Sequence, residues 1–328
     1  MHSLLNIFLV SLVLYGFEVE ANVRVPAEWE PHAATWMQWP GPYETHMRPA
    51  FANIIQVIQA YETLHLLTRD QNSKAQAQSF LQSRGIPLNN IIWHTVPIEN
   101  SWMRDNGPIY VTENGALKLQ NWGFDAWGGN FGLNIPFEDD DDIPNYVGNY
   151  LNMPVEDHSN YILERGNFET NGEGLVVLNW DCQSHRNPQL SQAQHEQIIR
   201  QAFGANQILW AYGHVPEDLT TGHIDGICRF ASNNTLVISD TGAYTELDLA
   251  DAATEIGLNV VWYPGDPNWL VGNGFVAAMA SNNAYENNLL KQILEDVFPN
   301  RDVYMVKAAS IAASGGGIHC VTNDQPLL

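Results

Sequence analysis

The chain alternates short apolar segments that fit β-strands with amphipathic segments that fit helices. Apolar side chains at positions 51, 54, 55 and 58 recur at helical spacing and predict a helix over residues 48–61. The apolar residues 64–68 predict the strand that follows. Further helices are expected over residues 73–84, 146–151, 191–203, 247–256 and 286–298, and further strands over 33–39, 91–96, 109–112, 116–120, 160–164, 174–178, 207–210, 227–230, 236–239, 259–263, 275–278 and 302–307.

This order of elements predicts an α/β fold. A helix recurs about every 60 residues, which indicates a helix-and-strand unit used about five times. No linker rich in Pro, Gly or Ser interrupts the pattern, so residues 22–328 are expected to form one domain. The acidic run Glu138–Asp142 lacks the ligand spacing and turn glycine of a calcium loop and is predicted to be a solvated surface run.

Composition narrows the class of function. Hydrophobic residues make up 45% of the chain, as in a folded globular protein. Fourteen basic residues stand against 37 acidic ones, and the formal net charge is -23. This balance argues against nucleic acid and anionic membranes as partners, because both attract clusters of Lys and Arg. Attraction of small cations is compatible with it.

The first residues fit a secretory signal peptide. Residues 4–14 are an apolar run, and small residues precede a cleavage site after Ala21. The run is too short to span a bilayer. We therefore expect residues 1–21 to be a signal peptide and the protein to be secreted, lumenal or periplasmic.

Three cysteines are an odd number, so at least one is outside any internal disulfide. Cys182 and Cys228 can pair and leave Cys320 free, and the alternative is that all three are buried and reduced.

Three stretches carry candidate chemistry. Glycines 315–317 allow a ligand to approach the backbone closely and are followed by Cys320, a nucleophile once ionised. "TGHIDG" holds His223, which can depress the pKa of a thiol and exchange protons with a leaving group, and Asp225. "SWMRDNGP" holds Asp105, whose alternative role is a structural partner of Arg104.

Two carboxylates beside a nucleophilic thiol would oppose thiolate formation, unless the substrate itself is cationic. A guanidinium is planar and presents donors that a carboxylate accepts in pairs. Its carbon is a poor electrophile, so catalysis must come from fixing its orientation and charge. The residues therefore favour a guanidine substrate.

The sequence resembles the family of agmatine deiminases and bacterial-type (Porphyromonas-type) peptidylarginine deiminases, which are guanidine-modifying enzymes of the pentein superfamily. The resemblance covers nearly the whole mature chain. It rests on five motifs in order, "PAEWEPHAATWMQWP", "SWMRDNGP", "NWGFDAWGG", "TGHIDG" and "GGGIHCVTNDQP".

The resemblance implies a fold and a mechanism. The fold would be a five-bladed α/β propeller of ββαβ repeats with the site at its central axis. Asp105 and Asp225 would clasp the guanidinium, and Cys320 would attack its carbon to form a thiouronium intermediate and expel ammonia. His223 would protonate the leaving nitrogen and then activate water. The family uses no metal or organic cofactor, and a homodimer is compatible with the resemblance.

Other residues are expected near the substrate. Glu164 and Asn167 are candidates for substrate contact, and Trp102 and Trp127 can line a channel for methylene groups, with core packing as the alternative. Gly316 and Gly317 would let the substrate approach. His319 is predicted to be structural, because adjacent side chains on a strand point to opposite faces.

The substrate is less sharply defined than the chemistry. The motifs favour agmatine, hydrolysed to N-carbamoylputrescine, over peptidyl-arginine, and free or methylated arginine are further alternatives. Cysteine-dependent amide hydrolysis leaves Asp105 without a role, and a non-catalytic binder of arginine-like ligands is a third class. Asn100, Arg165, Asn171 and Gly317 depart from the residues that many family members carry.

Overall fold

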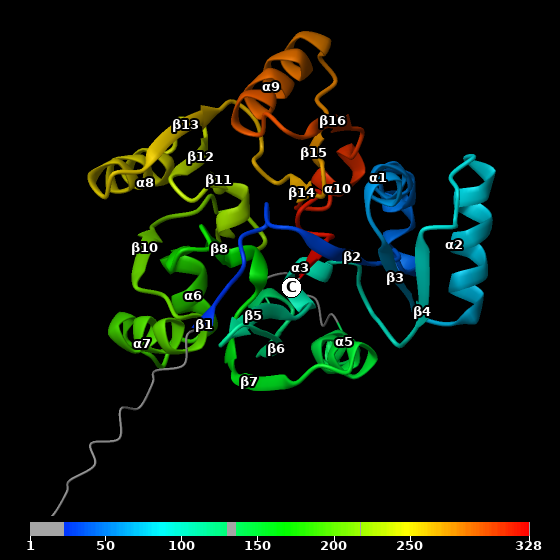
Figure 1. The fold of residues 1–328 in the computed structure, drawn as a ribbon, viewed down its shortest axis with the longest axis horizontal. Coiled ribbons are helices and arrows are strands. Elements are labelled where there is room, and N and C mark those ends of the chain that lie inside the picture. The colour runs from blue at the N-terminus through cyan, green and yellow to red at the C-terminus, as the bar shows by residue number, and fades with distance from the viewer. Residues whose placement is uncertain (1–22, 130–135, 217, 328) are drawn as a thin grey trace, which may run out of the picture.

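The fold is described from a computed structural model that covers residues 23–129, 136–216 and 218–327. Within these ranges the longer strands belong to five separate sheets, which lie around the middle of the molecule in Figure 1. The strands are β1 (Val23–Arg24), β2 (His32–Gln38), β3 (Leu64–Thr68), β4 (Ile91–Thr95), β5 (Ile109–Glu113), β6 (Ala116–Gly123), β7 (Val155–Ile162), β8 (Glu169–Thr170), β9 (Leu175–Asn179), β10 (Gln207–Ala211), β11 (Cys228–Ser232), β12 (Thr235–Ser239), β13 (Asn259–Tyr263), β14 (Leu270–Gly272), β15 (Phe275–Met279), β16 (Asp302–Val306) and β17 (Asn323–Pro326).

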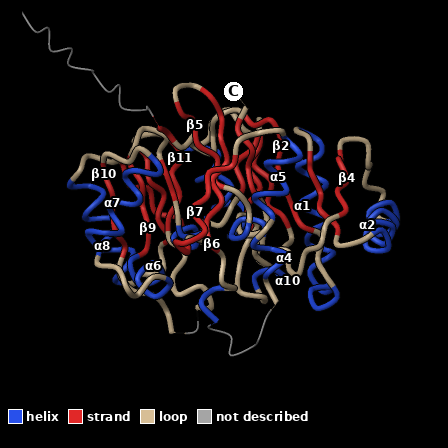
Figure 2. The backbone as a smooth tube through the Cα atoms, turned by 90° about the horizontal axis from the view of Figure 1, so that it is seen from below, coloured by secondary structure: helices blue, strands red, loops and turns tan. Residues whose placement is uncertain are grey.

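Helices lie around the sheets in Figure 2, with the strands standing side by side through the middle. No helix in the described ranges has the length and apolar composition needed to cross a bilayer. The helices are α1 (Arg48–Tyr61), α2 (Gln71–Ser83), α3 (Met103–Asn106), α4 (Glu138–Asp141), α5 (Ile143–Leu151), α6 (Trp180–Arg186), α7 (Gln192–Phe203), α8 (Tyr244–Glu255), α9 (Ala284–Val297) and α10 (Ala309–Ala312), with short 3-10 helices η1 (Pro42–Met47), η2 (Trp127–Gly129), η3 (Arg165–Asn167) and η4 (Ile224–Gly226).

One connection pattern recurs in the sheets. Two antiparallel strands are followed by a helix and a third strand parallel to the second, as in β11-β12-α8-β13 and β14-β15-α9-β16. Crossover through a helix is the usual way to join parallel strands. The sheet β17-β2-β3-β4 differs in one respect. Its antiparallel strand, β17, pairs with β2 but comes from the far end of the chain. The predicted α/β class is confirmed.

The hydrophobic pattern places the core where expected. Helix α1 buries four apolar side chains completely, those of Phe51, Ile54, Ile55 and Ile58. They form one apolar cluster with residues of the sheet β17-β2-β3-β4. All five residues of β3 (Leu64–Thr68) are buried, because β3 has a parallel neighbour on each side and helices cover the sheet. The predicted bounds of α1, β3 and β13 are those of the structure.

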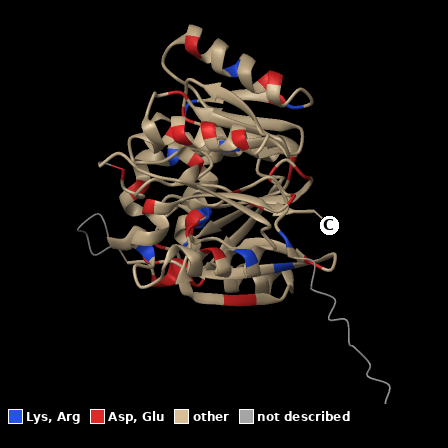
Figure 3. Ribbon diagram, turned by 90° about the vertical axis from the view of Figure 1, so that its left-hand side faces the viewer, with Lys and Arg blue, Asp and Glu red and all other residues tan. Residues whose placement is uncertain are grey.

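The acidic run departs from its prediction. Asp140 is fully buried, and it accepts hydrogen bonds from the side-chain amides of Gln38 at 3.0 Å and Asn100 at 2.5 Å. Burial raises the pKa of Asp140 to about 8. The prediction of a wholly solvated run is therefore wrong at this position, where α4 is attached to the stretch before α3. Elsewhere acidic positions lie across the surface helices (Figure 3).

The state of the cysteines decides between a Cys182–Cys228 disulfide and three reduced thiols. Cys182, Cys228 and Cys320 are all buried and free, so Cys182 and Cys228 do not pair. The residues proposed as a signal peptide lie outside the described ranges.

A buried ion cluster joins the last strand to the centre of the molecule. Asp324 of β17 accepts hydrogen bonds from Arg104 of α3 and Arg165 of η3, each at 2.8 Å, and all three side chains are buried. Burial opposes the charge of Asp324, but Arg165 and Arg104 outweigh it and lower its pKa to about 2.

Removing this carboxylate should destabilise the fold strongly. Asp324→Asn leaves two buried guanidinium groups without their shared partner, so we expect a loss of about 3–5 kcal/mol in the free energy of unfolding, measured by denaturant titration. The loss should be present above pH 4 and shrink as the pH falls through about 2, below which Asp324 is protonated in both states.

The matched control is Glu113→Gln, which breaks the half-exposed ion pair with Lys118. That change should cost less than about 1 kcal/mol. Equal losses for the two variants would contradict a structural role of Asp324 that depends on burial.

Candidate active site

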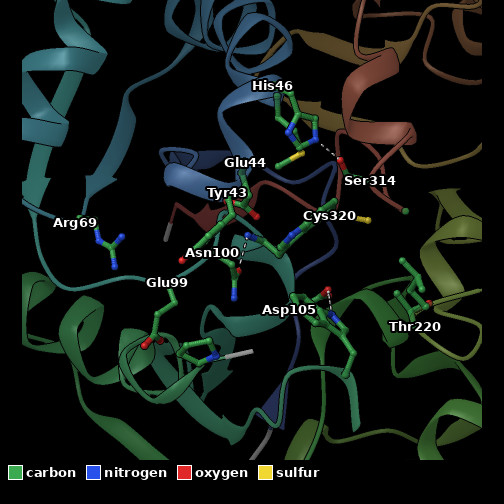
Figure 4. Close-up of a pocket in the computed structure, with 16 residues that line it drawn as sticks. Tyr43, Glu44, His46, Arg69, Glu99, Asn100, Asp105, Thr220, Ser314 and Cys320 are labelled. Carbon is green, nitrogen blue, oxygen red and sulfur yellow. Dashed lines mark hydrogen bonds between the residues drawn. The ribbon is translucent and has the colours of Figure 1, made fainter. Parts of the chain in front are cut away.

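A cavity of about 740 Å³ is lined by some of the residues that sequence patterns single out (Figure 4). Cys320 and Asp105 lie at one part of its wall and Glu99 and Arg69 at another. Its lining is completed by Tyr43, Glu44, His46, Met47, Asn100, Trp102, Trp127, Pro136, Leu219, Thr220, Ser314 and Gly315.

Cys320 lies in a turn between α10 and β17 and is 6% exposed. Its Sγ accepts a hydrogen bond from Nδ2 of Asn268 at 3.1 Å, and its backbone N donates to Oδ1 of the same side chain at 3.1 Å. The Sγ is also 3.7 Å from Oδ2 of Asp225. Burial, then Asp225 and Asp105, raise the pKa of the Cys320 thiol well above its usual range. The thiol is therefore protonated until a positive charge enters.

Asp225 is held by a chain of buried groups behind it. Its Oδ2 lies 2.7 Å from Nδ1 of His319, and Nε2 of His319 lies 2.7 Å from Oε2 of Glu28. The guanidinium of Arg229 donates to the same Glu28 oxygen at 2.7 Å. Burial opposes the charge of Asp225, but His319 outweighs it and lowers the pKa of Asp225. Asp225 is thus an ionised carboxylate beside the thiol.

Asp105 is fixed from two sides. Nε1 of Trp127 donates to Oδ2 at 2.9 Å, and the backbone N of Gly166 donates to Oδ1 at 3.1 Å. Burial raises the pKa of Asp105 to about 6. Arg104 instead pairs with Asp324, so the alternative in which Asp105 only balances Arg104 does not hold.

Unusual backbone conformations position two of these side chains. Ala126 and Trp127 have φ of 52° and 60°, and Thr221 has φ of 64°. Such left-handed conformations cost roughly 1–3 kcal/mol at a residue other than glycine, so the surrounding contacts must enforce them. The conformations of Ala126 and Trp127 accompany the hydrogen bond from the Trp127 indole to Asp105. Thr221 lies two positions before His223.

His223 bridges two carboxylates. Its Nε2 lies 2.8 Å from Oε2 of Glu164, and its Nδ1 lies 3.5 Å from Oδ1 of Asp105, without a hydrogen bond. Burial alone would lower the pKa of His223, but Asp105, Cys182 and Glu164 outweigh it and raise the pKa well above its usual value. The imidazolium therefore keeps Nε2–H on Glu164 and directs Nδ1–H toward Asp105, which lines the cavity.

Glu164 acts behind His223 rather than in the cavity. Its Oε1 accepts from Nε of Arg186 at 2.7 Å and its Oε2 faces His223. Burial opposes its charge, but Arg186 and His223 lower the pKa of Glu164 to about 2. Cys182 lies beside it, with Sγ 3.8 Å from Oε2. Glu164, Cys182 and His223 form a group with the geometry to hold a metal ion.

The structure brings Cys320, Asp105, Asp225 and His223 together, although Asp225 and His223 lie just behind the lining. Trp102 and Trp127 line the cavity as expected.

The expected substrate contacts near the glycine turns are placed differently. Gly315 lines the cavity, whereas the space beside Gly316 is taken by Trp102 and that beside Gly317 by Asn268. Asn167 is fully buried, and its side chain bonds Asn179 and Gln183.

Sequence reasoning missed several groups at the site. Asn268 lies in an irregular stretch after Pro267 without a pattern that marks it. Glu28 lies in the segment "PAEWEP", and the motif alone does not indicate that Glu28 contacts His319. His319 was placed on a strand, but residues 318–321 form a turn, and its ring points to Asp225.

Comparisons with known proteins give matches over most of the chain. The sequence profile described as "Porphyromonas-type peptidyl-arginine deiminase" matches residues 24–256 and 267–326. The agmatine deiminase of Pseudomonas aeruginosa is 28% identical over 92% of this chain and 95% of its own length.

Two solved structures share the fold. An agmatine deiminase of Enterococcus faecalis has a TM-score of 0.84 at 22% identity, and a C. jejuni agmatine deiminase with substrate bound has 0.82 at 20%. Each alignment covers 93% of this chain and 96% of the other.

Loss of the Asn268 side chain should make the Cys320 thiol harder to ionise. A hydrogen bond to a charged group is worth about 1.5–3 kcal/mol, so Asn268→Ala should raise the thiol pKa by about one to two units. Alkylation of Cys320 by iodoacetamide at a fixed pH, followed by peptide mass spectrometry, should slow about 10- to 100-fold.

Asn282→Ala is the control, because Asn282 is exposed. Asn268→Asp should slow alkylation further, since a carboxylate repels the thiolate. Unchanged alkylation in both Asn268 variants would show that this bond does not stabilise the thiolate.

Proposed function

The chain belongs to the Porphyromonas-type peptidyl-arginine deiminase family, and we propose that it is a guanidine iminohydrolase that converts agmatine and water to N-carbamoylputrescine and ammonia. One observation carries the proposal. A nucleophilic thiol, Cys320, lies against the buried carboxylate of Asp225 and shares a cavity with the buried carboxylate of Asp105. Buried negative charge of this kind needs a cation to compensate it.

Binding uses the planar cation. Asp105 and Asp225 accept hydrogen bonds from the guanidinium nitrogens, which fixes the plane of the group against Sγ of Cys320. Both carboxylates are buried, so each charge-assisted bond is stronger than it would be in solution. Trp102 and Trp127 pack along the methylene chain at the cavity wall.

The substrate activates the nucleophile. Asp225 and Asp105 raise the thiol pKa in the free enzyme, and a bound guanidinium neutralises their effect. The thiol proton is released to solvent as the cation binds, and Asn268 donates to the resulting thiolate. Sγ then attacks the guanidinium carbon, and a covalent thiouronium forms as ammonia departs.

His223 exchanges the protons. Its Nδ1–H protonates the departing nitrogen, while Glu164 holds the proton on Nε2. The neutral ring then accepts a proton from water at Nδ1. The hydroxide attacks the thiouronium carbon, the C–S bond breaks as the hydroxyl proton of the adduct passes to solvent, and the ureido product and the Cys320 thiolate are released.

The outer part of the cavity favours an amine at the other end of the substrate. Glu44 and Glu99 line it, and both carboxylates can face the ammonium group of agmatine. This supports agmatine over arginine, which carries a carboxylate at that end.

Arginine remains a second candidate because of Arg69. Its guanidinium lines the cavity, is exposed, and forms no hydrogen bond or ion pair within the described residues. A carboxylate at the far end, as in free arginine or a carboxy-terminal arginine of a peptide, would suit it. Amide hydrolysis and passive binding leave the paired carboxylates or the thiol without a role.

The remaining assignments belong to the same proposal. We propose that the five recurring units are the blades of a five-bladed pentein propeller of ββαβ repeats, in one domain over residues 22–328. The five sheets and the pairing of β17 with β2 support this proposal. Residues 1–21 are proposed to be a signal peptide that directs the protein to a secreted, lumenal or periplasmic location. The chemistry above is proposed to proceed without a cofactor, in a monomer or homodimer.

A substrate panel tests the function. We expect ammonia and ureido product in equal amounts from agmatine, and slower or no release from free arginine and an arginine peptide. Cys320→Ser should lower kcat by at least about 10⁴-fold, as for other activated nucleophiles, with the fold intact by circular dichroism. Arg69→Ala should affect arginine more than agmatine. A folded protein that releases no ureido product from any of these compounds would falsify the enzymatic reading.

Activity should follow the ionisation of Asp105. Only its unprotonated form can hold the guanidinium, and its pKa is raised to about 6. We expect the rise of kcat/KM for agmatine with pH to become about tenfold less steep per pH unit above pH 6, because this ratio reports groups of the free enzyme; the rise that remains above pH 6 comes from ionisation of the Cys320 thiol, whose pKa is raised well above its usual range. A midpoint near 4, the ordinary value for aspartate, would show that burial does not control this group.

A further inference from the structure

Cys182 is a buried thiol that the proposed mechanism does not use. It is 1% exposed, on α6 (Trp180–Arg186), and its sulfur faces Glu164 rather than an apolar cluster alone. Its thiol donates a hydrogen bond to Oε2 of Glu164 at 3.8 Å, which goes beyond the packing of a cysteine that behaves only as a small hydrophobe. Its surroundings therefore call for another account.

Three different metal-ligating groups meet at this point. Glu164 ends the stretch after β7, Cys182 comes from α6, and His223 precedes η4. One ligand atom from each lies within 4.8 Å of the other two, and all three side chains are buried. We propose that Glu164, Cys182 and His223 bind a thiophilic divalent cation such as Zn²⁺, and that the bound cation inhibits the enzyme by taking Nε2 of His223.

The distances are close to those of a zinc site. Zinc binds sulfur at about 2.3 Å and nitrogen or oxygen at about 2.0–2.2 Å, which separates tetrahedral ligands by about 3.3–3.7 Å. Sγ of Cys182 and Oε2 of Glu164 are 3.8 Å apart, and Nε2 of His223 and Oε2 are 2.8 Å apart. These two pairs of ligand atoms therefore need to shift by about half an ångström or less, the third pair lies within 4.8 Å, and water completes the four-coordinate set.

The exchange of ions leaves the local charge unchanged. In the metal-free site the imidazolium of His223 balances the carboxylate of Glu164, and Cys182 is a neutral thiol. Zn²⁺ displaces one proton from Nε2 and one from Sγ, so two positive charges replace two protons. Arg186 keeps its bond to the other oxygen of Glu164. Binding thus places no new net charge in the interior.

The cation would act on catalysis without blocking the cavity. With Nε2 bound to metal, the ring is a neutral imidazole, and its Nδ1–H is a far weaker acid than that of the imidazolium, so it no longer protonates the leaving nitrogen. Neither Glu164 nor Cys182 lines the cavity, so the substrate can still enter. The expected inhibition therefore lowers kcat and leaves KM nearly unchanged, in contrast to a metal bound at Cys320. This part of the inference rests on the proposed function.

Spectroscopy tests the site without activity. Cys320→Ser removes the cavity thiol, and Cd²⁺ is added to the full-length variant until the ultraviolet thiolate-to-cadmium absorption is constant. We expect one equivalent to bind. The absorption should disappear in Cys320→Ser/Cys182→Ser and persist in Cys320→Ser/Cys228→Ser, since Cys228 is the matched buried thiol.

Kinetics test the consequence. Zn²⁺ should lower kcat of the unmodified enzyme, reversibly on addition of EDTA. The concentration for half inhibition should rise at least about tenfold in Cys182→Ser, and in Cys182→Ala if the serine variant folds poorly, each compared with its own metal-free activity.

The outcomes are separable. Cadmium absorption that is absent, or that survives loss of Cys182, overturns the site, and equal zinc sensitivity of the unmodified enzyme and both Cys182 variants overturns its inhibitory role. If no guanidine is hydrolysed but the cadmium absorption depends on Cys182, the proposed function fails and the metal site stands.

Discussion

Negative charge held out of water is the constraint on which the site depends. Asp105 and Asp225 are both buried next to a thiol, an arrangement that opposes their own ionisation and that of Cys320. Each carboxylate is backed by the same order of groups. Asp105 faces His223, Glu164 and Arg186 in turn, and Asp225 faces His319, Glu28 and Arg229. These two Asp–His–Glu–Arg chains keep the carboxylates in place.

The two chains differ at the end that meets the substrate. His319 lies 2.7 Å from its aspartate and lowers the pKa of Asp225, whereas His223 lies 3.5 Å from its aspartate, and the pKa of Asp105 stays near 6. The closer contact suits a group that only holds charge. The looser contact leaves Nδ1 of His223 without a hydrogen bond, as a proton carrier requires. The His319–Asp225 pair thus holds a fixed charge, whereas His223 beside Asp105 is left able to exchange a proton.

Sequence reasoning reached the periodic elements and the residues in motifs. α1 was predictable because its apolar spacing is helical, and β3 because it is a short apolar run. The contacts of Asn268, Glu28 and His319 were not predictable, because they join residues 52 to 291 positions apart through turns without periodicity. The burial of Asp140 was missed for a similar reason, since its partners lie about 40 and 102 positions away.

The pairing of β17 with β2 has a consequence for how the protein is made. Trp36 and Gln325 bond across 289 positions, and the nucleophile lies just before this last strand. A ribosome releases the early segments long before their partner exists, so β2 must wait with an unpaired edge. The nascent chain therefore lacks both Cys320 and the partner of β2 until residues 320–326 have emerged, and contacts this distant make maturation slow.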